Sequence, residues 1–263
     1  MWMAMDGFIL PVLLVFLVVA VGVVVDEPAF RGRFHVFEDR SHAGVLLAGM
    51  LEEYRGREGC LVLAIPAGGV EVAVPLCRRL DVRFDLAVTR KIHIPWNREA
   101  GFGAVTWRGS VLINRPLLGA LELTWEEVER CIEEEKEAIE RRLRAFRGDA
   151  PPLDLEGRVV IVVDDGMASG FSMLATVREV RGCGAGEVVV AVPTASSGAI
   201  SLVRPHADRV FCLNVRSGPV FAVADAYRKW YDLTDEDVVR LLREAGELFA
   251  AHGPHLGGER GDG

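Results

Sequence analysis

The stretch Val159–Ser172, with the sequence VVIVVDDGMASGFS, constrains the fold of this chain more than any other part of it. Its first five residues are apolar and β-branched, which is typical of a parallel strand buried on both faces. Two adjacent carboxylates, Asp164 and Asp165, follow where that strand should end, and a loop of small residues comes next. A helix is then predicted from Phe171 until Gly182 stops it. The stretch therefore predicts a strand, loop and helix unit of an α/β fold.

The small-residue loop and the helix start together form an anion site. Free backbone N–H groups and the positive end of the helix dipole face the same point there. The acids beside this point would repel an anion, so Asp164 and Asp165 suit hydroxyl groups of the same ligand, or a metal. We therefore expect a ligand that carries a phosphate next to a diol.

Other motif classes fit this stretch less well. A P-loop needs Lys and then Ser or Thr after its last glycine, but Phe171 follows Gly170. The loop also lacks the Gly-x-Gly-x-x-Gly spacing of a dinucleotide fingerprint. A receiver domain needs a further Asp after the next strand, where this chain has Pro193-Thr194-Ala195-Ser196. A simple turn cap does not require two acids together with the glycines.

The sequence VVIVVDDGMASGFSM resembles the phosphoribosyl-pyrophosphate (PRPP) signature of type I phosphoribosyltransferases. In that family the two acids hold the ribose 2- and 3-hydroxyls, and the loop cradles the 5-phosphate. The resemblance assigns the ribose to Asp164 and Asp165. It assigns the 5-phosphate to the loop and helix start, namely Gly166, Met167, Ala168, Ser169, Gly170, Phe171 and Ser172.

A second strand, glycine loop and helix unit begins with the apolar run Leu61–Ile65. The loop after it resembles the pyrophosphate loop of the family, although members often have a basic residue where Ala67 stands. A basic pair further on resembles the start of the family's flexible loop and offers cations for the leaving group. The resemblance thus assigns pyrophosphate binding to Ala67, Gly68, Gly69, Arg90 and Lys91.

Alternating strands and helices predict an α/β fold. We expect strands at Leu61–Ile65, Phe84–Val88, Val159–Val163, Val188–Val192 and Arg209–Leu213. They should form a doubly wound, mostly parallel five-stranded sheet, like that of type I phosphoribosyltransferases. Ligands bind such sheets beyond the carboxyl ends of the strands, where the winding reverses. If the first and third of these strands are neighbours there, both anion loops face one cleft.

Two insertions are expected in this sheet. The segment Ile92–Gly103 is typical of a mobile loop, and the residues from Gly103 to Asn114 alternate as a β-hairpin does. Thr124 then opens a long helix with a capping box to Glu127. The many charges of this helix predict a solvated face.

The N-terminal segment is strongly apolar. Gly7–Val25 contains no charge over nineteen residues and as a helix would span roughly 28 Å, about the thickness of a hydrocarbon core. We therefore expect Gly7–Val25 to be a membrane anchor, and the basic residues that follow it at Arg31, Arg33 and Arg40 would keep the rest of the chain in the cytoplasm. A misassigned translation start, with the protein beginning near Phe37, is the alternative. The predicted organisation is an apolar segment at 1–25, a linker at 26–37, the phosphoribosyltransferase-like domain at 38–250 and a disordered tail at 251–263.

The composition of the chain limits which partners it can bind and indicates its redox compartment. A formal charge of −8 argues against a nucleic-acid-binding surface. The five cysteines are scattered and have no CxxC spacing, which indicates reduced thiols in the cytoplasm and argues against a zinc site.

The resemblance implies transfer of the 5-phosphoribosyl group from PRPP to a nitrogen acceptor, with a nucleobase expected, and release of pyrophosphate. Arg90, Lys91, Asp164 and Asp165 are the expected catalytic residues, and Trp96 and Phe221 are candidates to stack on a planar acceptor. Mg²⁺ is implied and should be held through the pyrophosphate, without direct protein ligands. A homo-oligomer, most simply a dimer, is also implied. A non-catalytic PRPP or nucleotide-binding regulator on the same fold is the alternative, which the Ala67 position favours and the basic pair opposes.

Overall fold

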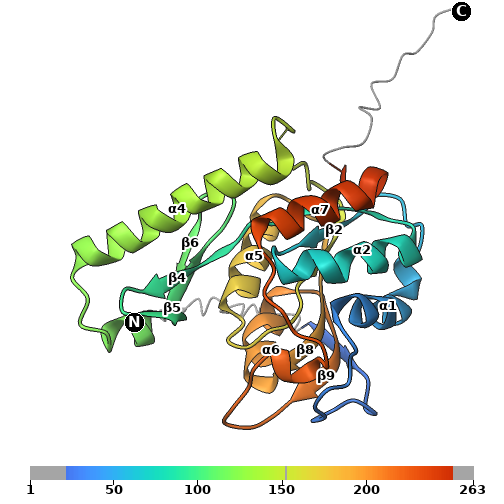
Figure 1. Ribbon diagram of the computed structural model, residues 1–263, viewed down its shortest axis with the longest axis horizontal. Helices are drawn as coiled ribbons and strands as arrows, with labels where there is room; N and C mark the ends of the chain where they lie inside the picture. Colours follow the sequence, from blue (N-terminus) through green and yellow to red (C-terminus); the bar gives the residue numbers. More distant parts are fainter. Residues whose placement is uncertain (1–21, 152, 251–263) are drawn as a thin grey trace, which may run out of the picture.

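A six-stranded sheet forms the centre of the computed structural model, which describes residues 22–151 and 153–250 (Figure 1). All neighbouring strands in it are parallel. Their order across the sheet is β1 (Val23–Asp26), β9 (Arg209–Arg216), β8 (Glu187–Ser196), β7 (Val159–Val163), β2 (Cys60–Ala64) and β3 (Arg83–Leu86). The predicted doubly wound, mostly parallel α/β fold is confirmed.

The winding reverses between β2 and β7. From β7 the chain continues through β8 to β9 on one side, whereas β2 is followed by β3 on the other. Cys60 pairs with Val159 and Ala64 with Val163, so the two strands end level with each other. The loops that leave them therefore emerge side by side, as the assumed strand order required.

Helices cover both faces of the sheet. On one face lie α1 (Arg40–Met50) and α2 (Gly68–Leu80), with α7 (Asp235–Ala245) packed against α2; α5 (Phe171–Gly182) and α6 (Ser197–Val203) cover the other. The packing of β7 explains why its sequence has no polar residue, since both of its faces are buried. Ile161 and Val163 enter the core beneath α1 and α2, and Val160 and Val162 enter the core beneath α5. Full burial of each such side chain stabilises the folded state by about 1.5–3 kcal/mol.

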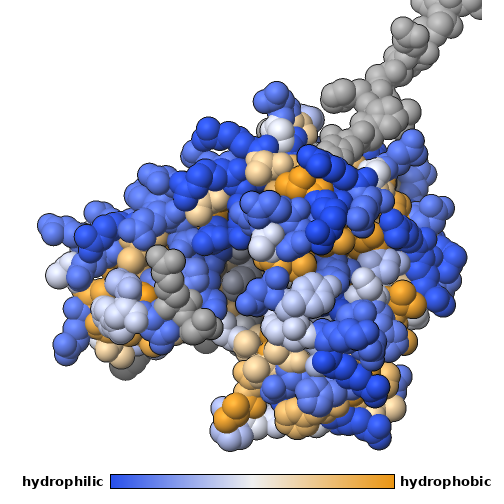
Figure 2. Space-filling model, in the orientation of Figure 1, coloured by the Kyte–Doolittle hydropathy of each residue, from blue (hydrophilic) through white to orange (hydrophobic). Residues whose placement is uncertain are grey.

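A smaller antiparallel sheet and a long helix stand to one side of this body (Figure 1). The small sheet contains β4 (Arg90–Ile94), β5 (Asn97–Val105) and β6 (Val111–Ile113). The helices beside it are α3 (Arg115–Gly119) and α4 (Trp125–Arg147). The predicted hairpin and the capping box of α4 are confirmed, and the exposed side of α4 is mainly hydrophilic (Figure 2).

The prediction of a mobile loop at Ile92–Gly103 is wrong, because these residues form the β4–β5 hairpin. The polar turn around Trp96 conceals the strand pattern in the sequence. What holds the hairpin is distant in sequence: Ile92 and Phe102 are fully buried in the same core as Val128 of α4.

The sixth strand was not predicted. Val23–Asp26 pairs with β9, so the last residues of the proposed membrane segment and the first of the proposed linker are part of the sheet. Residues 1–21 of the apolar segment, and the tail at 251–263, lie outside the described residues. Among the residues that the structure describes, no helix is long and apolar enough to cross a membrane.

The segment at 26–37 is packed on the domain, which corrects its interpretation as a linker. The buried amide of Asn214 on β9 donates hydrogen bonds to the carbonyls of Phe30 (2.8 Å) and Arg33 (2.9 Å). His35 N–H donates to the Asp225 carbonyl at 2.8 Å. Because these backbone groups are satisfied by β9 and by the segment before Tyr227, the linker region covers one end of the sheet.

Candidate active site

The two predicted anion loops touch each other at the ends of β2 and β7. A Cβ at Gly68 would lie only 1.9 Å from Asp165 Oδ2, and a Cβ at Gly69 would lie 2.8 Å from the Val163 carbonyl oxygen. The peptide bond between Pro66 and Ala67 is cis, and α2 begins at Gly68 without a side-chain cap. Glycine is thus required here for space, and the loop brings the N-terminus of α2 against the acid pair.

The loop after β7 is anchored to the end of β8. Met167 N–H donates to the Thr194 carbonyl and Ser196 N–H to the Met167 carbonyl, both at 2.9 Å, while the Met167 side chain is buried in the core. Gly170 has a φ of +78°, a conformation that suits glycine, and α5 begins after it without a side-chain cap. From Gly166 to Ser172 the loop therefore offers backbone groups and hydroxyls, and none of these side chains is charged.

A cavity of about 200 Å³ lies over this loop. Its lining comes from the loop, the start of α5, one acid, one lysine and the C-terminal segment, namely Lys91, Asp164, Gly166, Met167, Ala168, Ser169, Gly170, Ser172, Met173 and Val223. The structure thus brings Lys91 and Asp164 together with most of the predicted 5-phosphate residues.

The two acids differ in their surroundings. Burial, together with the adjacent Asp165 carboxylate, raises the pKa of Asp164 well above its usual value. Burial also raises the pKa of Asp165, but the Arg40 guanidinium beside it opposes that rise. Asp164 Oδ1 accepts a hydrogen bond from the Asp165 N–H at 2.8 Å. Two carboxylates held this closely form an unfavourable arrangement that a ligand with hydroxyl donors would relieve.

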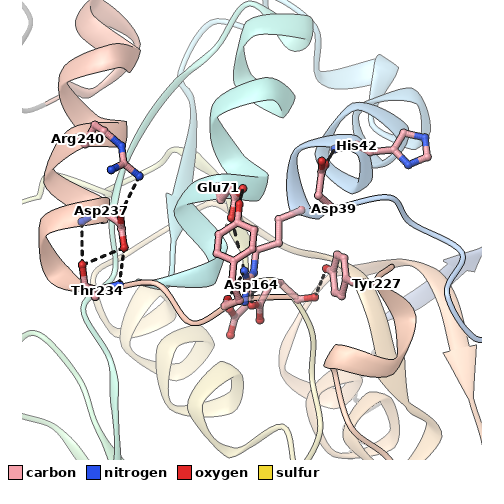
Figure 3. Close-up of polar contacts among 11 residues, drawn as sticks. Asp39, His42, Glu71, Asp164, Tyr227, Thr234, Asp237 and Arg240 are labelled. Atoms are coloured by element: carbon pink, nitrogen blue, oxygen red, sulfur yellow. Dashed lines mark hydrogen bonds and ion pairs between the residues drawn. The ribbon is translucent and has the colours of Figure 1, made fainter. Parts of the chain in front are cut away.

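Arg40, at the start of α1, is the partner of Asp165. Its Nε donates to Asp165 Oδ2 at 2.8 Å, and its side chain is only 4% exposed. The Tyr227 hydroxyl donates to the backbone carbonyl of Asp165 at 2.6 Å. Figure 3 shows Glu71, Asp164 and Tyr227 converging on this point from separate segments of the chain. The Tyr227 side chain is itself buried in the core.

The predicted basic pair is separated by the small sheet. Lys91 lines the cavity, and its stem lies against Gly101 of β5, where a Cβ would be 2.2 Å from the Lys91 Cγ. Arg90 instead forms an ion pair with Glu135 of α4. His93 Nδ1 lies 2.8 Å from the same carboxylate, because the pairing of β4 shifts register on either side of His93. In this structure Arg90 is engaged by Glu135 while Lys91 lines the cavity over the 5-phosphate loop, and the joint role of the pair at the pyrophosphate stays a prediction.

The predicted acceptor residues lie apart from the cavity lining. Trp96 is 65% exposed at the tip of the β4–β5 hairpin. Phe221 is half-buried, and its ring centre lies 5.0 Å from the guanidinium carbon of Arg216. Val223, two residues later, is the member of this segment that reaches the cavity. Stacking of an acceptor on either aromatic ring remains a prediction.

Comparison with known proteins adds an independent observation. Residues 42–226 match the family model described as the phosphoribosyl transferase domain. The chain belongs to the phosphoribosyltransferase family. A protein from two Mycobacterium tuberculosis strains, provisionally named a phosphoribosyl transferase, is 32% identical over 218 residues, which are 83% of this chain and 49% of that protein. The chain therefore spans about half the length of the curated relatives it matches.

A solved relative supports the same fold. The crystal structure of TT1426 from Thermus thermophilus matches this chain with a TM-score of 0.64 and 37% identity. The match covers 79% of this chain and 98% of that one.

Sequence reasoning missed two residues of this candidate site, Arg40 and Glu71. Arg40 was counted only among the basic residues after the apolar segment, and no local motif marks it. Glu71 carries a weak signal, because it is a single acid within the apolar run GGVEVAV. It is 7% exposed, and its Oε2 has no hydrogen-bond partner among the described residues.

The donor set of this site fits a magnesium ion that a substrate carries in. Within the described part of the chain, no three His, Cys, Asp or Glu residues lie together as a metal cluster. Mg²⁺ keeps several waters and is bound largely by substrate phosphates in such sites, so a protein cage is not required. Mg²⁺ held through the pyrophosphate stays a prediction.

Proposed function

We propose that this chain transfers the 5-phosphoribosyl group from PRPP to a nitrogen acceptor, with a nucleobase as the expected class. The observation that carries the proposal is the contact between the Gly68 loop and Asp165 at the reversal of the sheet. It leaves an acid pair between two uncapped helix starts. PRPP has the matching chemistry, with a diol between a 5-phosphate and a 1-pyrophosphate.

Each part of the site has a role in this reaction. Asp164 and Asp165 accept hydrogen bonds from the ribose hydroxyls, and the loop from Gly166 to Ser172 binds the 5-phosphate through backbone N–H groups and hydroxyls. Gly68 and Gly69 admit the pyrophosphate to the start of α2. The C1–O bond breaks with its electron pair going to pyrophosphate, the lone pair of the acceptor nitrogen forms the new bond to C1, and the proton of the acceptor N–H is released to pyrophosphate or water. Positioning and charge stabilisation supply most of the catalysis.

Mg²⁺ bound to the pyrophosphate would spread the charge of the leaving group. Asp164, Asp165 and Lys91 would lie on the ribose side of PRPP when it is bound. Lys91 adds a cation from the protein, which the loop at Ala67 lacks.

A non-catalytic PRPP or nucleotide-binding regulator is the second candidate. Two observations favour it: the pyrophosphate loop has Ala67 in place of a basic residue, and Arg90 is engaged by Glu135. A regulator would bind PRPP without releasing pyrophosphate.

A screen for pyrophosphate release from PRPP tests the proposal. The purified protein is incubated with Mg²⁺, PRPP and a panel of nucleobases and other nitrogen acceptors, and pyrophosphate is measured by an enzyme-coupled assay. Acceptor-dependent release supports the transferase. Tight binding of PRPP by calorimetry with no release for any acceptor would favour the regulator.

Single substitutions of Arg90 and Lys91 should have different effects on kcat and on stability. Lys91→Ala is expected to lower kcat by about tenfold or more with a smaller change in KM, because Lys91 meets charge that grows on the leaving group. Arg90→Ala removes an ion pair to α4 and should lower thermal stability, with a smaller effect on kcat. Steady-state kinetics and thermal unfolding of both variants check this. Equal losses of kcat would return Arg90 to the pyrophosphate site.

A further inference from the structure

We propose that Arg40 is a positioning residue for PRPP, which acts by holding Asp165 in the orientation that receives the ribose. This inference rests on the proposed function. Arg40 lies 125 residues before Asp165 in the chain, on the helix α1 that precedes the pyrophosphate loop. Its guanidinium approaches the acid pair from within the protein.

The guanidinium is held in one orientation by several contacts. Its Nε donates to Asp165 Oδ2 at 2.8 Å, and its Nη1 donates to the Tyr231 carbonyl oxygen at 2.9 Å. The ring centre of Trp230 lies 3.9 Å from its central carbon. Because these contacts fix both ends of a planar group, a flexible lysine would replace them only in part.

Glu71 completes this arrangement on the other side. Its Oε2 lies 3.6 Å from Arg40 Nη1, and its Oε1 accepts a hydrogen bond from the Tyr231 hydroxyl. Glu71 is in the first turn of α2, two residues after the second glycine of the pyrophosphate loop. The same guanidinium therefore contacts the ribose acid pair and the helix that begins at the pyrophosphate loop.

The position of Asp165 depends on these contacts. Asp165 Oδ2 accepts the hydrogen bond from Arg40. The same oxygen atom would clash with a Cβ added at Gly68. Its backbone is held separately by Tyr227, through the carbonyl. Loss of Arg40 would leave the carboxylate beside Asp164 without the cation that draws it away. We therefore expect a misplaced carboxylate while the loop backbone stays in place.

A double-mutant cycle on PRPP affinity tests this role. Calorimetry with Mg²⁺ and PRPP is performed on the full chain, on Arg40→Gln, on Asp165→Asn and on the double variant. We expect each single change to weaken PRPP binding by roughly tenfold to hundredfold, the range of a lost charge-assisted hydrogen bond. The double variant should bind no more weakly than Asp165→Asn alone, because Arg40 acts through Asp165. Arg40→Lys should retain part of the affinity.

A second buried ion pair gives the matched control. Arg147 donates to both oxygens of Asp85, at 2.9 and 3.1 Å, and these side chains are 11% and 3% exposed. Arg147→Gln should lower thermal stability and leave PRPP affinity unchanged, in both the wild-type and the Asp165→Asn backgrounds. The control shows how much of any loss comes from breaking a buried pair.

The outcomes separate the two proposals. Unchanged PRPP affinity in Arg40→Gln, or losses in the double variant that equal the product of the single losses, would overturn the role of Arg40. If Arg40→Gln fails to fold, Arg40→Lys decides the question. Unchanged PRPP affinity in Arg40→Lys would then overturn the positioning role, because a positive charge without the guanidinium geometry would be enough for binding. Absence of PRPP binding by the wild-type protein would instead overturn the proposed function.

Discussion

Gly68→Ala is expected to lower kcat/KM for PRPP by about 100-fold or more, the cost of displacing reacting groups by about 1 Å. The new methyl carbon would lie 1.9 Å from Asp165 Oδ2 and 2.4 Å from its Cγ. Either the carboxylate or the loop must move, and both belong to the proposed PRPP site. Steady-state kinetics with the acceptor found in the screen measure the effect.

Gly49→Ala supplies the control for this change. Gly49 is an exposed residue of α1, and nothing lies within 4 Å of its added Cβ. The substitution should keep full activity and raise stability by up to about 1 kcal/mol, because alanine favours a helix interior. Wild-type kinetics in Gly68→Ala would show that the loop contact has no part in PRPP binding.

Asp164→Asn and Asp165→Asn should both weaken PRPP binding, by roughly tenfold to hundredfold each. Their effects on stability should have opposite signs. Asp165→Asn leaves the buried Arg40 without its carboxylate, which should destabilise the fold by about 3 kcal/mol. Asp164→Asn removes a carboxylate whose ionised form is unfavourable at neutral pH, and an amide oxygen can still accept the Asp165 N–H.

Asp164→Asn is expected to raise stability because the pKa of the Asp164 carboxyl group is raised in the folded state. The folded state holds that proton more tightly than the unfolded state does, so ionisation costs stability as the pH rises above the unfolded value of about 3.9. The advantage of Asp164→Asn should therefore be absent in acid, grow with pH, and level off above the folded-state pKa. Thermal unfolding from pH 4 to 8 measures this. A variant less stable than wild type at neutral pH would contradict it.

Much of this fold and site was predictable because the signals are local. Strand β7 has no polar residue because it is covered on both faces, and its observed bounds are those predicted. The glycines at 68, 69 and 170 mark places where the backbone approaches another group or takes a positive φ. The capping box that opens α4 involves residues three apart. Each of these features leaves a local pattern in the sequence, even where its partner is distant, as Asp165 is from Gly68, so the sequence alone is enough to find it.

Other features were decided only by the tertiary structure. Arg40 and Asp165 meet across 125 residues, and Arg90 and Glu135 across 45. Strand alternation predicts that neighbouring side chains face opposite ways, but not which one faces the cavity. The register shifts around His93 then place that side chain with Arg90, against simple alternation. Strand β1 likewise needs the edge of β9 to pair with. Contacts of this kind leave no periodic pattern, because they depend on how the separate elements pack.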